Sequence, residues 1–325
     1  MTKRLTAGWI GPQPGDPKPI LYFSGHCGNP SADQWKKGSI SAYEKRMALE
    51  GPINYRCFSY AFVGPKEFMP HSFDRQRDTL AWYHRHKRRM FLDSGAFSIQ
   101  QAIRKGSMKN VNMRPIINSY ARFILKEAEQ GHSYDFQVTF DYLKQAPLVY
   151  EVTRFLRKEY GLQLTPVYHG DSSLDWFHRY VDEGHRLICV GRVKALGSRG
   201  LRAYYERLFE EADRLGGVQL HGLMVTGQNV YRFPWHSVDS ATWTRLAAHG
   251  RIALVDPVRR RISHIRVSNT NISKGHQELI RRNGFDPDTL ASSALERRIY
   301  NIREFLKVCS DFDYLTGRAK WAPFF

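Results

Sequence analysis

Residues 135–168 read DFQVTFDYLKQAPLVYEVTRFLRKEYGLQLTPVY, which has the pattern of a strand, a helix and a second strand. The apolar runs at 135–140 and 164–168 are typical of parallel strands that are covered on both faces. Between them, residues 147–160 repeat apolar side chains at helical spacing. A strand and a helix that alternate in this way predict an α/β architecture.

The same alternation extends outward over most of the chain. Strands are predicted at 20–24, 55–61, 89–93, 135–140, 164–168, 186–190, 218–223 and 236–239. Helices are predicted at 115–130, 147–160, 173–184 and 201–215. Eight strands are the number that a (β/α)8 TIM-type barrel requires, and we predict that fold. An open doubly wound sheet fits the same alternation and remains the alternative.

The alternation stops after residue 250. Residues 251–269 indicate a basic hairpin or extended segment, and 275–283 and 289–309 indicate helices. We therefore predict a barrel domain at 1–250 and a basic C-terminal appendage at 251–325, packed on the barrel. The appendage contains the arginines that we expect to contact nucleic acid: Arg259, Arg260, Arg261, Arg281 and Arg282.

The charge balance indicates the class of partner. The 325 residues include 49 Lys+Arg against 31 Asp+Glu, a formal net charge of +18. Such an excess is typical of proteins that bind a polyanion, because each phosphate contact releases counterions. A generally basic proteome is the alternative explanation. No apolar run is long enough to predict a membrane span, and the first residues lack the apolar stretch of a secretory signal.

Neither the cysteines nor the histidines have the spacing of metal ligands. Cys27, Cys57, Cys189 and Cys309 are too scattered for a zinc motif and suit a reducing cytoplasm. The histidines are scattered in the same way. The sequence therefore predicts no metal site and no cofactor.

Carboxylates stand at the ends of three predicted strands. Asp93, Asp141 and Asp239 close the runs at 89–93, 135–140 and 236–239. In TIM barrels the reacting groups lie at the carboxyl ends of strands. Paired carboxylates suit displacement at an anomeric carbon, where one attacks the sugar and the other moves a proton. The alternative is structural, because an Asp after a strand often caps the next helix.

Short motifs around these residues resemble one enzyme family. Residues 92–98, LDSGAFS, resemble the DSGGFQ motif of the tRNA-guanine transglycosylases, and 134–141 resemble that family's strand ending in a base-reading Asp. The segments 168–170, 190–192 and 220–222 resemble its VQG, VGE and LMG segments. Residues 233–243, FPWHSVDSATW, are more similar to the DNA-modifying (DpdA-type) branch. The motifs occur in the family's order over residues 89–243.

The resemblance implies a role for each matched residue. Asp239 would be the nucleophile, Asp93 the general acid and base, and Asp141 the acceptor for the Watson–Crick edge of guanine. Phe97 would stack on the base. The remaining matched positions would line the base pocket: Ser94, Gly95, His169, Gly191, Arg192, His221 and Gly222. For His169 and His221, a buried histidine with satisfied hydrogen bonds at a strand end is an equal alternative.

We therefore predict an enzyme that exchanges guanine in DNA for a 7-deazaguanine such as 7-cyano-7-deazaguanine, with DNA and the free base as partners. The chain lacks the family's zinc motif, which favours DNA over tRNA. Arg192 replaces an acidic residue, which favours a neutral 7-substituent. A zinc-free tRNA enzyme and a non-catalytic nucleic-acid-binding barrel are the alternatives. The resemblance implies a viral or bacterial gene, hence the cytoplasm of a bacterial cell.

Two other features have two interpretations each. The basic run at 84–89 is either a phosphate contact or a solvated helix end, and we favour the solvated end. Trp235 and Trp243 flank Asp239 and either stack on neighbouring bases or pack under the barrel rim.

Overall fold

The computed structural model describes residues 19–24, 42–50, 53, 55–68, 74–106, 108, 112–141, 145–191, 196–225, 227–268 and 271–308. Eight parallel strands form one curled sheet in the order β4-β3-β2-β1-β8-β7-β6-β5, and helices alternate with them. Neighbouring strands in the sheet are also consecutive in the chain, and the last strand, β8, pairs with the first, β1. A doubly wound sheet would instead reverse its order at a switch point.

The two edges of the sheet, β4 and β5, are also joined. An isolated parallel bridge links Val138 to Thr165, and the Thr165 N–H donates to the Gln137 carbonyl at 2.8 Å. The architecture is the predicted (β/α)8 TIM-type fold. The chain divides into two compact units, whose limits do not coincide with the domain boundary predicted after residue 250. That boundary stays a prediction.

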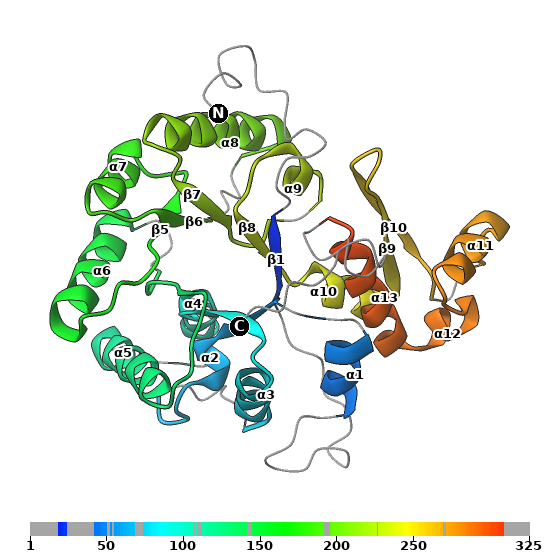
Figure 1. The fold of residues 1–325 in the computed structure, drawn as a ribbon, viewed down its shortest axis with the longest axis horizontal. Coiled ribbons are helices and arrows are strands. Elements are labelled where there is room, and N and C mark those ends of the chain that lie inside the picture. Colours follow the sequence, from blue (N-terminus) through cyan, green and yellow to red (C-terminus); the bar gives the residue numbers. More distant parts are fainter. Residues whose placement is uncertain are drawn as a thin grey trace. The chain divides into compact units, whose positions relative to one another are not determined.

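The first compact unit, here the central unit, comprises Ser31–Ser41 and Asn54–Leu223. Its strands are β2 (Tyr55–Ser59), β3 (Arg89–Asp93), β4 (Phe136–Gln137), β5 (Val167–His169), β6 (Leu187–Gly191) and β7 (Gln219–Gly222). Its helices are α2 (Tyr60–Val63), α3 (Asp74–Arg85), α4 (Ala96–Arg104), α5 (Met113–Glu129), α6 (Ala146–Tyr160), α7 (Leu174–Asp182) and α8 (Ser198–Arg214). Figure 1 shows α5, α6, α7 and α8 outside the strands of this unit.

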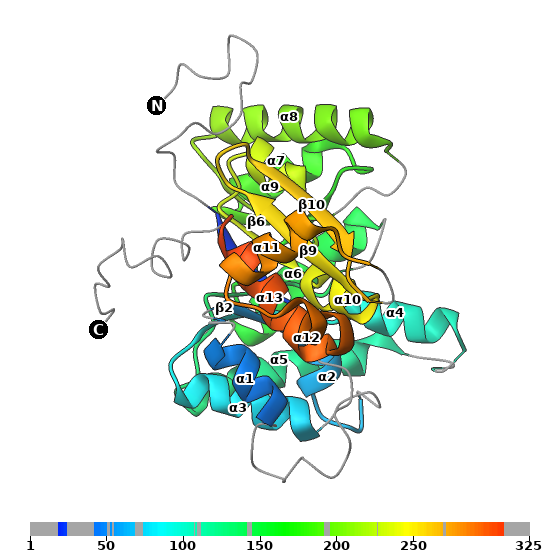
Figure 2. The ribbon, with the colours of Figure 1, turned by 90° about the vertical axis from the view of Figure 1, so that its right-hand side faces the viewer.

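The second compact unit, here the terminal unit, comprises Met1–Pro30, Ala42–Ile53 and Met224–Phe325. Its strands are β1 (Ile20–Phe23), β8 (Ser237–Ser240), β9 (Arg251–Asp256) and β10 (Arg261–Arg266). Its helices are α1 (Ala42–Glu50), α9 (Gln228–Arg232), α10 (Thr242–Ala248), α11 (Lys274–Arg282), α12 (Pro287–Ser292) and α13 (Ala294–Leu306). Figure 2 shows the β9–β10 hairpin with α11 and α13 beside it.

Aromatic packing fills the strand layer of the central unit. Phe91 on β3 stacks on Phe136 of β4, with ring centroids 4.7 Å apart and planes inclined by 8°. His221 of β7 meets both rings edge-on at 4.9 Å. These rings come from strands that are distant in sequence, so their burial stabilises the barrel rather than one local hairpin.

Buried polar side chains of α13 hold the terminal unit together. The Asn301 Oδ1 accepts the Ala253 N–H at 2.7 Å, and its Nδ2 donates to the Trp243 carbonyl at 3.0 Å. Arg297 donates to the carbonyls of Ala247 and Leu290 at 2.9 and 2.7 Å. Because these donors and acceptors are buried, breaking one leaves an unsatisfied group, so α13 fixes both α10 and the hairpin.

Candidate active site

Asp93 is the last residue of β3, and the chain turns sharply after it. The Gly95 N–H donates to Asp93 Oδ2 at 2.9 Å, and Gly95 has a φ of 73° at the N-cap of α4. A Cβ on Gly95 would lie 2.6 Å from the Ala61 backbone nitrogen, so only glycine fits. The bond to Gly95 closes the turn before α4. It is not the helix cap that was the structural alternative for Asp93, because the N-cap of α4 is Gly95 and no side chain caps it.

Phe97 follows in the first turn of α4. Its side chain is 40% exposed, whereas Ala96 and Ile99 beside it are buried. An exposed aromatic ring four residues after Asp93 provides a flat apolar surface, which a base requires for stacking. Ser94, another predicted pocket residue, is buried.

Asp141 lies just beyond β4 and contacts the end of β5. His169 Nε2 and Asp141 Oδ1 are 2.7 Å apart, and His169 is the last residue of β5. From α4, the Gln100 Nε2 donates to the Asp141 carbonyl at 2.9 Å. The helix that Asp93 and Gly95 begin therefore also positions Asp141.

Gly191 makes room for the histidine. It ends β6 opposite His169 in the parallel register, and a Cβ there would lie 2.2 Å from His169 Nδ1. A side chain at position 191 would push the ring off Asp141. The ends of β4, β5 and β6 thus form one interlocked group, the Asp141–His169–Gly191 cluster.

The electrostatics of this cluster favour a charged histidine. Burial by itself lowers the pKa of His169, but the hydrogen bond and the negative charge of Asp141 outweigh it and raise that pKa. A protonated imidazole donates from Nε2, so Asp141 accepts that bond as a carboxylate. The pairing also compensates a buried charge that would otherwise be costly.

Asp239 belongs to the terminal unit, where it is the third residue of β8. Its partner in the parallel register with β1 is Tyr22, and it is 5% exposed. The Met224 N–H donates to Asp239 Oδ1 at 2.8 Å. A backbone donor thus fixes one oxygen of a buried carboxylate, as a preorganised nucleophile requires.

Met224 is a residue that the sequence interpretation missed. It has a φ of 54°, a left-handed conformation that costs energy in a residue with a side chain, and its side chain is 47% exposed. The strained turn points its N–H at Asp239 and leaves an apolar side chain exposed. Nothing in the run Leu223-Met224-Val225 signals a positive φ, because it continues an apolar strand pattern.

Other predicted positions have different surroundings. His221 is 0% exposed among Phe91 and Phe136, so its ring offers no surface to a base in this arrangement, and Gly222 is buried beside it. Trp235 and Trp243 are also buried: their indole N–H groups donate to the carbonyls of Asn229 and Ser24 at 3.0 and 2.8 Å. For both tryptophans the packing interpretation holds. Arg192 lies outside the described residues.

The predicted nucleic-acid-binding arginines lie in the terminal unit. Arg259 and Arg260 form the β9–β10 turn with Arg260 at a φ of 51°, and Arg261 begins β10. Arg281 and Arg282 are in the last turn of α11. Four of the five are exposed and Arg260 is half-buried. Two of them have partners, since Arg259 lies 3.9 Å from Asp256 and Arg281 donates to Gln277 at 3.4 Å.

The basic run at 84–89 is largely the solvated helix end that we favoured, because Arg85, His86, Lys87 and Arg89 are exposed where α3 ends. Some of its side chains nevertheless have partners. The side chain of His84 is almost fully buried against Glu127, and His86 stacks on Trp82 with ring centroids 4.0 Å apart. Arg89 pairs with Asp135 at 2.9 Å. These contacts show that part of the run belongs to the packing of α3.

No family model and no curated protein matches the chain. The functional assignment therefore depends on the motifs and on the geometry of the residues that carry them. Among the described residues, no helix is long and apolar enough to cross a membrane.

Proposed function

We propose that the chain is a DNA guanine transglycosylase, which exchanges guanine in DNA for a 7-deazaguanine base through a covalent glycosyl-enzyme. The observation that carries the proposal is that Asp93, Asp141 and Asp239 each lie in or just beyond the carboxyl end of a barrel strand, namely β3, β4 and β8. Reacting groups of TIM-type enzymes come from these positions. The order of the three agrees with the motif order of the family that the sequence resembles.

In the proposed first step Asp239 attacks the anomeric carbon of the deoxyribose. A bond forms between that carbon and a carboxylate oxygen, while the bond to guanine N9 breaks and its electron pair stays with the base. Asp93 provides the proton that the departing guanine takes up. The Met224 N–H, which donates to Oδ1, holds this carboxylate in place for the attack.

The second step reverses the first with a different base. Asp93, now a carboxylate, takes the N9 proton from the incoming 7-deazaguanine. N9 then bonds to the anomeric carbon, and Asp239 is released as a carboxylate. Two displacements at one carbon retain its configuration.

Base recognition is assigned to the central unit. A guanine in a duplex must be flipped out before its glycosidic bond is accessible, and the flipped base needs a stacking surface and a hydrogen-bond acceptor. The exposed Phe97 ring provides the surface. Asp141 would accept the N1–H and N2–H of guanine, with His169 fixing its carboxylate orientation.

DNA binding is assigned to the arginines of the terminal unit. Exposed guanidinium groups at the hairpin turn and at the end of α11 suit phosphate contacts, which position a nucleic acid without reading its sequence. The neutral 7-substituent remains a sequence-based proposal, because Arg192 lies outside the described residues.

The test is a base-exchange assay. Guanine-containing DNA is incubated with the protein and 7-cyano-7-deazaguanine, digested to nucleosides and analysed by mass spectrometry. We expect the deazaguanine nucleoside with wild type and with Asp182→Asn, a control on the exposed side of α7. We expect none with Asp239→Asn or Asp93→Asn.

Two results would replace the proposal. Incorporation into tRNA and not into DNA would keep the chemistry and assign the other polymer. Incorporation into neither, with tight DNA binding that Asp239→Asn leaves unchanged, would identify a non-catalytic binding barrel.

A further inference from the structure

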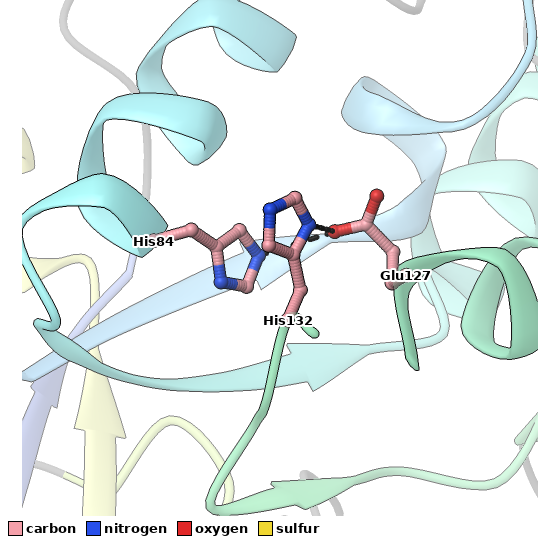
Figure 3. Close-up of side chains that lie close together, drawn as sticks. All are labelled: His84, Glu127 and His132. Atoms are coloured by element: carbon pink, nitrogen blue, oxygen red, sulfur yellow. Dashed lines mark hydrogen bonds and ion pairs between the residues drawn. The ribbon is translucent and has the colours of Figure 1, made fainter. Parts of the chain in front are cut away.

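Two histidines and a glutamate meet at the amino-terminal ends of β3 and β4. His84 lies in the last turn of α3, Glu127 in the last turn of α5, and His132 in the loop that leads into β4. Figure 3 shows both imidazole rings directed at the same carboxylate oxygen. Glu127 and His132 are close in sequence, but His84 lies on the earlier helix α3, so spacing along the chain does not reveal the three residues as one group.

The separations of these atoms suit one bound cation. His84 Nε2 and His132 Nδ1 each lie 3.1 Å from Glu127 Oε2, and all three donor atoms are within 4.8 Å of one another. Four-coordinate Zn²⁺ with bonds of about 2.0–2.1 Å places neighbouring ligand atoms roughly 3.3 Å apart. The two nitrogen–oxygen separations are therefore close to those of a zinc site.

The surroundings hold the glutamate and leave one side accessible. The Tyr134 hydroxyl donates to Glu127 Oε2 at 3.1 Å. His84 is almost fully buried, whereas the side chain of His132 is 29% exposed. A fourth ligand, water, can approach beside His132.

The two rings are nearly parallel, with centroids 4.0 Å apart and planes inclined by 7°. Parallel rings direct their lone pairs in parallel, so both nitrogens bind one ion only after one ring turns. His132 is the ring that can turn, because it lies in a loop and is partly exposed.

We propose that His84, Glu127 and His132 form a zinc site with water as the fourth ligand. The ion would join α3, α5 and the loop before β4. It would act as a structural clip, since the amino ends of barrel strands serve stability and the carboxyl ends serve catalysis. The site is independent of the proposed base exchange, whose central-unit residues lie at the other ends of the same strands.

Zinc binding tests the proposal directly. Protein stripped with a chelator is titrated with ZnCl₂ by calorimetry, and Co²⁺ is used in parallel for its visible spectrum. We expect one equivalent of Zn²⁺, the visible bands of four-coordinate Co²⁺, and a rise in wild-type Tm of about 5 °C at saturation. His132→Ala and Glu127→Gln should each weaken Zn²⁺ binding by about 100-fold.

A second histidine–glutamate pair provides the matched control. His178 of α7 and Glu211 of α8 are 2.5 Å apart, measured from Nε2 to Oε1. Among the described residues, no second histidine joins this pair in a metal-binding group. His178→Ala should bind Zn²⁺ as wild type does. A wild-type Tm that does not respond to Zn²⁺, or equal binding by wild type and His132→Ala, would overturn the proposal. Loss of zinc from His178→Ala to the same degree would also overturn it.

Discussion

The central unit uses histidine–carboxylate pairs at both ends of its strands, and the two differ in how they are built. At the carboxyl ends, one histidine meets one carboxylate, and Gly191 leaves space for the ring. At the amino ends, His84 and His132 share the single carboxylate of Glu127. The first pair fixes a carboxylate just beyond β4, whereas the second joins two helices to a loop.

The pKa shifts show the same difference. Burial lowers the pKa of His169, but the hydrogen bond and charge of Asp141 outweigh it and raise that pKa, which favours the protonated imidazole. At the amino end, burial opposes ionisation of Glu127, but hydrogen bonds and charge from His84 and His132 outweigh it and lower the pKa of Glu127. The carboxyl-end pair therefore favours the charged form of His169, and the amino-end group favours the charged form of Glu127.

Among the substitutions that test the two histidine–carboxylate groups, Gly191→Ala is expected to have the largest effect on base exchange. Its Cβ would lie 2.2 Å from His169 Nδ1, so the ring must leave Asp141. We expect base exchange to fall by about 100-fold, the scale of a 1 Å misplacement in an active site. Unfolding free energy should fall by about 1–3 kcal/mol from overpacking. Gly275→Ala on α11, where a Cβ meets nothing within 4 Å, is the control and should retain full exchange.

Gly95→Ala tests the turn that positions Asp93. Both the φ of 73° and the 2.6 Å approach to Ala61 disfavour a side chain. We expect a loss of about 2–4 kcal/mol in urea denaturation, from the left-handed conformation and the clash together. Gly161 has a φ of 68°, and a Cβ there would meet no atom within 4 Å. Gly161→Ala therefore measures the cost of the left-handed conformation alone, about 1–2 kcal/mol. Equal losses in the two variants would show that Ala61 does not restrict this turn.

His169→Ala tests the charged pair through its pH dependence. Because the folded-state pKa is raised, the stabilisation is fully present below the unfolded value of about 6.5 and is lost as pH rises through the folded value. We expect wild type to exceed His169→Ala in unfolding free energy by more at pH 6 than at pH 9. A difference that grows with pH would contradict the assignment.

Glu127→Gln tests the amino-end cluster without added metal. The lowered pKa means that the stabilisation is present above the unfolded value of about 4.3 and is lost as pH falls through the folded value. We expect a loss of about 1–2 kcal/mol at pH 7, the scale of buried hydrogen bonds to a charged group. Denaturation of stripped protein should show the two proteins converge near pH 3. A constant difference from pH 7 to pH 3 would show that the carboxylate charge contributes nothing.

The smallest effect is expected from the basic surface. Arg281→Gln combined with Arg282→Gln should leave folding unchanged and reduce the slope of log K for DNA against log salt by about 2. Fluorescence anisotropy with an oligonucleotide at several salt concentrations measures that slope. Arg202→Gln on α8, whose guanidinium pairs with Glu206, is the control. An unchanged slope in the double variant would remove α11 from the DNA-binding surface.

The barrel could be predicted because each of its strands is recognisable from a few consecutive residues. Each strand is a short apolar run, and the predicted ranges fall on β1 to β8. The helix predicted at 289–309 was wrong, since it breaks at Ser293, whose Oγ accepts the Glu296 N–H at 3.3 Å. The sequence Ser293-Ala294-Leu295-Glu296 is a capping-box signature that could have located this start.

The site was only partly predictable, for a physical reason. Asp93, Asp141 and Asp239 were identifiable because residue type and position at a strand end carry the signal. Their partners depend on long-range geometry: Met224 approaches Asp239 through a strained turn, and His221 packs into the aromatic core. The cluster of His84, Glu127 and His132 likewise exists only once α3 and α5 are packed.

The central claim is that Asp239 becomes covalently attached to the sugar. The most direct measurement incubates wild type and Asp239→Asn with a guanine-containing oligonucleotide in the absence of incoming base, then denatures the mixture and determines intact masses. The account predicts a protein–DNA adduct in wild type that maps to Asp239 and is absent from Asp239→Asn. An adduct that persists in Asp239→Asn, or base exchange by that variant at the wild-type rate, would contradict it.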